Sequence, residues 1–418
     1  MADWIGAAAA AQRLGVKQAT LYAYVSRGVL RRRRAADGRS SLFDPGEVEE
    51  LARRGRPRRT AGPAELVIES ELTEIVGDRL CYRGWDVIAL AAERSFEEVA
   101  GLLWSGAFST VSGWRPTPAA VTAGAAAQSA LPAGTLPLER LQVIVPAMAA
   151  TNPLRLHFDP PAVVSAARNI IAGMVDCLPA AAAPPSPAAA AARELPAAGP
   201  ADTLLAGRLW TRLCPDRPDP GLLAALRAAL VLLADHELAA STLAARVAAS
   251  VRADPYAVVA TGLGALGGAL HGGASLGAET MLAAAREPGE APRVVGDLLR
   301  RGERIPGFGH FVYRDGDPRA LLLLGLVRKA APGSARLAVA EAVLAEVRAH
   351  ALPEPNIDFA LATLASVAGM ITGAGEAMFA VARAAGWIAH ALEEYTRGAP
   401  LRPRAVYTGP SAPAHDRD

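Results

Sequence analysis

Aromatic residues are scarce in this 418-residue chain: Phe, Trp and Tyr make up 5% of it, although 51% of its residues are hydrophobic. The apolar content comes from Ala, Leu and Val, which favour closely packed helices over extensive sheet. No stretch reaches the roughly 18 uninterrupted apolar residues of a membrane span. The first residues include Asp3 and no basic leader, so no signal peptide is expected. These absences predict a mainly helical protein that is not held in a membrane.

Cysteine is also rare, and metal-ligand patterns are missing. The three cysteines are odd in number and lie in no paired spacing: Cys81, Cys177 and Cys214. Buried or idle thiols in a reducing cytoplasm are the expected state of such residues. No Cys/His spacing suits zinc, and no Walker loop is present, so neither a metal nor a nucleotide cofactor is expected.

The length and the charge distribution indicate more than one domain. A chain of 418 residues is too long for one small core. Residues 1–60 hold 13 Lys/Arg against 6 Asp/Glu, a net charge of +7, while the remainder carries −5. A basic head on a mildly acidic body is typical of an appended module with a partner of its own.

The head, residues 1–56, reads as helix, turn, helix and hairpin. Helices are expected over Gly6–Leu14 and Lys17–Ser26, a basic hairpin over Leu30–Phe43, and a third helix from Pro45 to Leu51. This order resembles the winged helix-turn-helix of MerR and excisionase-type regulators. The resemblance implies a second helix in the DNA major groove and wing arginines, Arg31–Arg34, on phosphates. A head that only contacts protein is the alternative. Residues 57–65 are expected to be a linker.

The C-terminal half contains four loops with chemically useful side chains. The chain has only seven histidines, yet three of them lie in glycine-marked or otherwise distinctive loops. The phrases are ADHELAAST around His236, ALHGGAS around His271, GFGHFVYRDGDPRA around His310 and PEPNIDFALA around Asp358. Two imidazoles and a carboxylate base are what proton abstraction beside a carbonyl requires.

These phrases, together with YRGWD near residue 84, resemble the citrate synthase family over roughly 300 residues within 66–410. The resemblance implies a two-domain helical fold. The large domain would span about 66–260 and 360–410, and the small domain about 261–359. Within it we expect a short strand pair turning at Gly77-Asp78 and a helix capped by Ser95 and Glu98. The Ala/Pro-rich stretch 178–202 is expected to be exposed, and the tail 411–418 disordered.

The resemblance also implies catalytic roles. Asp358 would be the general base, His271 would stabilise the thioester enol, and His310 would polarise the keto group of oxaloacetate. Burial between Ile357 and Phe359 would make the Asp358 carboxylate more basic. A simple helix N-cap is the alternative for Asp358, and close helix packing is the alternative for the glycines around His271.

Substrate-binding residues follow from the same resemblance. Oxaloacetate would be held by His236, His310, Arg319, Arg383 and Arg402, and guanidinium groups bind carboxylates bidentately. Arg402 would come from the neighbouring subunit of a homodimer. The CoA moiety would lie along the loop that contains Ile305, Gly307, Phe308, Gly309 and Phe311. Two departures from the family pattern stand out: Ser275 replaces an asparagine, and Phe311 replaces a residue that is often basic.

The sequence therefore predicts a cytoplasmic enzyme that condenses acetyl-CoA with oxaloacetate and needs no cofactor. A 2-methylcitrate synthase that uses propionyl-CoA is the first alternative, because one methylene changes binding by only about 1–3 kcal/mol. A DNA-binding regulator that uses the synthase body as a ligand-sensing dimer is the alternative of another class.

Overall fold

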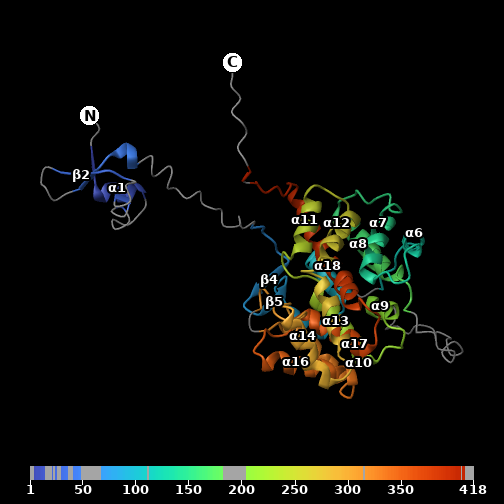
Figure 1. Ribbon diagram of the computed structural model, residues 1–418. Helices are drawn as coiled ribbons and strands as arrows, with labels where there is room; N and C mark the ends of the chain where they lie inside the picture. The colour runs from blue at the N-terminus through green and yellow to red at the C-terminus, as the bar shows by residue number, and fades with distance from the viewer. Residues whose placement is uncertain are drawn as a thin grey trace. The chain divides into compact units, whose positions relative to one another are not determined.

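The computed structural model describes residues 4–14, 21, 24–25, 30–35, 41–48, 67–110, 113–181, 204–313, 316–405 and 407–409. These residues form two compact units, one within 1–69 and one within 70–418 (Figure 1). The predicted linker 57–65, the tail 411–418 and most of the Ala/Pro-rich stretch lie outside the described residues.

The first unit contains a small sheet. Strand β3 (Ser41–Phe43) pairs antiparallel with both β1 (Ile5–Gly6) and β2 (Arg32–Arg34), and β1 is followed by α1 (Ala7–Leu14). The β2–β3 pair is the hairpin expected over Leu30–Phe43, and the β2 arginines are exposed. Residues 45–48 are helical. Most of the expected second helix lies outside the described range, so the helix-turn-helix assignment stays a prediction.

The second unit opens with a three-stranded antiparallel sheet. β4 (Thr73–Val76) pairs with β5 (Arg79–Tyr82), and β5 pairs with β6 (Trp85–Asp86). Gly77 has a φ of 64°, which the two-residue turn needs and glycine adopts without strain. α4 (Val87–Glu93) follows directly. α5 (Phe96–Ser105) begins with a complete capping box between Ser95 and Glu98, so the predicted cap is confirmed.

Helices make up the rest of the described body, as the composition predicts. They are α6 (Pro118–Ser129), α7 (Pro137–Ala149), α8 (Pro160–Asp176), α9 (Leu205–Leu213), α10 (Pro220–Leu233), α11 (Ala240–Ser250), α12 (Pro255–Leu266), α13 (Gly273–Ala284), α14 (Ala291–Arg300), α15 (Pro318–Ala330), α16 (Ala335–Ala349), α17 (Ile357–Ala368) and α18 (Ala374–Arg397). In the part of the chain that the structure describes, no helix is both long enough and apolar enough to cross a membrane.

The core of this unit is organised around α18, whose residues from Ala374 to Leu392 are all buried. α18 packs against α5, α7, α8, α10, α11, α12, α13 and α17, and Figure 1 shows it in the middle of the helical body. Small residues on all sides of α18 allow this close approach. At Gly262 of α12, for example, an added Cβ would lie 2.5 Å from the Trp387 ring. A composition with few aromatic side chains thus accompanies helices that lie close to one another.

Candidate active site

A cavity of about 890 Å³ lies where the four loops meet in the second unit. Its lining contains the predicted site residues except Arg402: His236, His271, Ile305, Gly307, Phe308, Gly309, His310, Phe311, Arg319, Asp358 and Arg383. Arg402 is exposed in the segment after α18 and lies outside this lining. One chain therefore brings together both candidate catalytic histidines, the candidate base and two of the three arginines.

Backbone hydrogen bonds join the His310 loop to the Asp358 loop. Gly309 N–H donates to the Glu354 carbonyl at 2.8 Å, and Asn356 N–H donates to the Gly307 carbonyl at 2.9 Å. Gly307 and Gly309 have φ values of 81° and 78°, so the loop depends on glycine. An added Cβ at Gly307 would also lie 2.7 Å from Phe359 Cβ. This pairing fixes the His310 loop against the start of α17.

The contacts of His310 determine which ring nitrogen carries its proton. Nδ1 accepts hydrogen bonds from the backbone N–H groups of Val312 at 3.0 Å and Tyr313 at 3.3 Å. Burial, with Arg319 adding to it, lowers the pKa of His310 to about 4. The ring is therefore neutral at pH 7, and Nε2–H is the only donor that it can offer.

The His271 ring is contacted by a hydrogen-bonded relay from α18 and α11. Trp387 Nε1–H donates to Ser241 Oγ at 3.3 Å, and Ser241 Oγ lies 2.7 Å from His271 Nε2. A Ser241 hydroxyl that donates to Nε2 leaves the proton of the neutral His271 ring on Nδ1, and we assign the ring this tautomer. Burial and then Arg383 lower the pKa of His271 to about 4. His271 therefore offers one Nδ1–H donor.

Asp358 lies in the first turn of α17 but is not its cap. Asn356 caps the helix by accepting from Asp358 N–H at 3.0 Å, so the N-cap interpretation of Asp358 is wrong. Burial raises the pKa of Asp358 to about 6, while a hydrogen bond from Ser275 Oγ to Oδ1 opposes the rise. The carboxylate is ionised at pH 7 and more basic than an exposed aspartate, as a general base requires.

Two buried arginines and a neutral histidine form another side of the cavity. Arg319 is 2% exposed and makes two hydrogen bonds to Asp317, at 3.0 Å and 2.8 Å. Arg383 is 1% exposed and donates to the Leu233 carbonyl at 2.8 Å. His236 Nε2 lies 3.0 Å from Tyr313 OH, and burial together with the arginines lowers the pKa of His236 well below its usual value. This side suits a small dianion.

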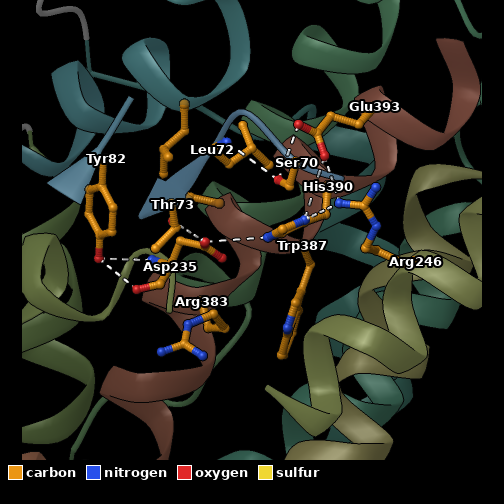
Figure 2. A network of polar contacts seen from close by, with 12 residues as sticks. Ser70, Leu72, Thr73, Tyr82, Asp235, Arg246, Arg383, Trp387, His390 and Glu393 are labelled. Atoms are coloured by element: carbon orange, nitrogen blue, oxygen red, sulfur yellow. Dashed lines mark hydrogen bonds and ion pairs between the residues drawn. The ribbon is translucent and has the colours of Figure 1, made fainter. Parts of the chain in front are cut away.

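A buried polar network surrounds Asp235, the residue before His236 (Figure 2). The Asp235 carboxylate accepts from Thr73 Oγ1 at 2.5 Å and from His390 Nε2 at 3.3 Å. Arg246 donates to His390 Nδ1 at 2.6 Å, which leaves Nε2–H for Asp235. Tyr82 OH donates to the Asp235 carbonyl at 2.7 Å. His390 thus touches the backing of the loop and not the cavity.

The network holds the loop in a conformation that it would otherwise avoid. Glu237, next to His236, has a φ of 52°, which costs a non-glycine residue on the order of 1 kcal/mol. α18 approaches the loop closely at Gly386, whose N–H donates to the Ala234 carbonyl at 2.9 Å. A Cβ at Gly386 would collide with the Asp235 side chain. The groups that position the His236 loop therefore lie outside the lining of the cavity.

Several of these residues carry no sequence signal of their own. Ser241, Tyr313 and Asp317 contribute through the side chains that they contact, which are His271, His236 and Arg319, respectively. The departure at Ser275 was visible in the sequence, but its contact with Asp358 was not. Among the residues that the structure describes, no cluster of three or more His, Cys, Asp or Glu side chains is placed to hold a metal ion.

Comparison with known proteins shows what this geometry is similar to. Residues 64–404 match the family described as "Citrate synthase, C-terminal domain". The citrate synthase of Haloferax volcanii is 36% identical over 373 residues, which cover 82% of this chain and 94% of that protein. A 2-methylcitrate synthase of Mycobacterium tuberculosis is 30% identical over 378 residues, covering 85% and 91%.

The fold of the second unit is also similar to that of a solved structure. The citrate synthase of Thermoplasma acidophilum, in a ternary complex with carboxymethyl coenzyme A and oxaloacetate, superposes with a TM-score of 0.68. It is 25% identical, and the superposition covers 84% of this chain and 96% of that one. The family match begins at residue 64, so the basic head lies outside it.

Proposed function

The chain belongs to the citrate synthase family, and we propose that its cavity condenses acetyl-CoA with oxaloacetate to give citrate and free CoA. The observation that carries this proposal is one carboxylate with a pKa of about 6 beside two imidazoles that burial keeps neutral. Enolisation of a thioester needs a base at the α-carbon and a hydrogen-bond donor at the carbonyl oxygen at the same moment.

The first step makes the nucleophile. Asp358 removes a proton from the methyl group of the thioester, and His271 Nδ1–H donates to the carbonyl oxygen as negative charge develops there. With a pKa of about 4, His271 stays a neutral hydrogen-bond donor throughout the reaction at pH 7. The hydroxyl of Ser275 steadies the carboxylate through its second oxygen.

The second step forms the carbon–carbon bond. The enolate attacks the keto carbon of oxaloacetate, whose oxygen accepts from His310 Nε2–H. The alkoxide formed gains one proton, and the proton that Asp358 took from the methyl group balances it. Arg319, Arg383 and His236 hold the carboxylates of oxaloacetate in the cationic part of the cavity. Water then cleaves the thioester and releases CoA. All of these steps use side chains of the protein, so we propose that no cofactor is required.

A homodimer with shared active sites is part of the proposal, because Arg402 is missing from the cavity of its own chain. Arg402→Ala should then lack substrate affinity, and mixing it with inactive Asp358→Asn should restore part of the activity. The mixed dimer would have one site with both residues intact. A mixture that exchanges subunits and stays inactive would contradict the shared site.

The choice of acyl donor has a second candidate, 2-methylcitrate synthesis from propionyl-CoA, which the Mycobacterium tuberculosis relative's name supports. The proposal predicts oxaloacetate-dependent thiol release from acetyl-CoA, lost in His271→Ala. Comparing kcat/KM for acetyl-CoA and propionyl-CoA decides between the two donors. No thiol release from either donor, by a folded protein that still binds oxaloacetate, would favour the regulator.

The head is proposed to be a winged helix-turn-helix that contacts DNA. Its support is the β2–β3 hairpin with exposed Arg32–Arg34 in a segment with a net charge of +7. A DNA-binding regulator with a ligand-sensing body remains the alternative function, and a protein-contact head the alternative for this unit. A cytoplasmic location is also proposed, since Cys81, Cys177 and Cys214 are buried free thiols.

A further inference from the structure

The N-terminus of α18 is held by an acidic side chain of α13. Glu279 Oε2 accepts from Gly373 N–H, and Glu279 Oε1 accepts from Gly375 N–H, both at 2.7 Å. Both donors belong to glycines: Gly373 has a φ of 82°, and a Cβ at Gly375 would lie 2.9 Å from Glu279 Oε1. One carboxylate thus takes two of the backbone donors that a helix N-terminus leaves unpaired. We call this contact the α13–α18 joint.

The α13–α18 joint lies one helical turn from the hydrogen bond to the candidate base. Ser275 and Glu279 are four residues apart on α13, so both lie on the same face of that helix. Ser275 packs on the first turn of α18, since a Cβ at Gly375 would lie 3.3 Å from Ser275 Cβ. The Ser275 hydroxyl donates to Asp358 Oδ1. A change in the separation of α13 and α18 at the joint therefore moves the donor that contacts Asp358.

Glu376, the residue after Gly375, is a second acidic side chain at the start of α18 and has no partner. It is 4% exposed, and it makes no hydrogen bond or ion pair with the part of the chain that the structure describes. Glu376 precedes Phe379 by three residues and Arg383 by seven, so it shares the face with which these two line the cavity. Burial without a donor favours the protonated form of a carboxyl group.

The charged groups that act on Glu376 are all acidic. They are Glu279 on α13, Glu139 on α7 and Asp358 on α17, and these three helices pack against α18. Burial, followed by these three carboxylates, raises the pKa of Glu376 to about 7. Glu376 is therefore mostly protonated at pH 6, whereas at pH 8 it adds a second negative charge beside Glu279.

We propose that Glu279 and Glu376 make the α13–α18 joint sensitive to pH, so that Glu376 is a positioning residue for the general base. While Glu376 keeps its proton, the joint holds Ser275 against Asp358. When Glu376 ionises, repulsion between carboxylates on the two helices weakens the joint, and the hydrogen bond to Asp358 is lost. The proposal rests on the function proposed above and gives condensation an upper pH limit near neutrality, in addition to the lower limit that protonation of Asp358 sets.

Two measurements test the α13–α18 joint, and one of them does not depend on catalysis. Amide hydrogen exchange of peptides that contain Gly373 and Gly375, corrected for the intrinsic pH dependence of exchange, reports on the joint directly. The pH profile of kcat/KM for oxaloacetate-dependent thiol release reports on the positioning of the base. Both are measured from pH 6 to pH 9 for the wild type, Glu376→Gln, Glu376→Asp and Glu139→Gln, and melting curves verify that each variant is folded.

In the wild type, corrected exchange at the joint should rise and kcat/KM should fall, each by at least about fivefold between pH 6.5 and pH 9. Glu376→Gln, which cannot ionise, should abolish both changes and stay within about twofold of wild-type activity at pH 6.5. Glu376→Asp keeps a carboxyl group and should retain both changes. Glu139→Gln should retain them as well and is the matched control, because Glu139 is exposed.

Corrected exchange at the joint that does not change with pH would overturn the proposal. An alkaline fall in kcat/KM that Glu376→Gln shares equally would also overturn it. The exchange profile of the wild type decides the question even if Glu376→Gln does not fold. Absence of thiol release at every pH would instead overturn the proposed function, and the exchange profile would still test the joint.

Discussion

Asp358→Asn should abolish turnover and at the same time stabilise the fold. The substitution keeps an oxygen that can accept from Ser275 but removes the base, so kcat should fall by at least ~10². Burial raises the pKa of Asp358 from 3.8 to about 6. A shift of about two units corresponds to roughly 3 kcal/mol at 1.36 kcal/mol per unit.

The sign of the stability change follows from the direction of the pKa shift. Because the folded pKa is higher than the unfolded one, ionisation of Asp358 opposes folding. This cost is fully present above pH 6, shrinks to about half at pH 5 and disappears below the unfolded pKa of about 4. The asparagine variant, which does not ionise, should therefore gain most at pH 8.

Urea unfolding at pH 8 and pH 5, followed by circular dichroism, measures this gain. Asp216→Asn, at an exposed position, is the matched control and should change the free energy of unfolding little. A variant that loses activity but whose gain in stability over the wild type is no larger at pH 8 than at pH 5 would show that Asp358 is not held at a raised pKa. Near-normal turnover would remove Asp358 from the role of base.

Three further changes have defined outcomes. Ser275→Ala removes a donor to the ionised Asp358, so the acid limb of the kcat/KM profile should move up by at least about one pH unit; an unmoved limb would contradict this role. Gly386→Ala should lower the free energy of unfolding by at least about 2 kcal/mol because the methyl group meets a buried carboxylate, while Gly296→Ala, where a Cβ meets open space, should be tolerated. Deleting residues 1–59 should leave condensation within a few-fold and remove any salt-sensitive affinity for duplex DNA; a folded but inactive body would refute the division of the chain.

The parts of the site that the sequence predicted are those that glycine and proline mark. His271 and His310 stand next to glycines, and the structure places both rings in one cavity, with Gly307 and Gly309 at positive φ. Asp358 follows a Pro-Asn pair, and the asparagine caps the helix. Such local signals survive without knowledge of the fold, because backbone geometry at a loop restricts which residues can occupy it.

The supporting contacts could not be predicted because they depend on which helices pack together. Ser241 reaches His271 from a residue 30 positions away, and Tyr82 reaches Asp235 from 153 positions away. The sequence marks Ser275 as a departure from the family pattern but does not indicate its contact with Asp358.

The polar network around Asp235 joins segments that are translated early with segments that are translated late. Its contacts link residues as far apart as Ser70 and Glu393, which are separated by 323 positions. A ribosome-bound chain that still lacks α18 has no His390 to pair with Asp235 and no Gly386 to receive the loop. The His236 loop can therefore reach its strained conformation only after α18 has been synthesised. Completion of the active site is then a late step in the folding of the newly made chain.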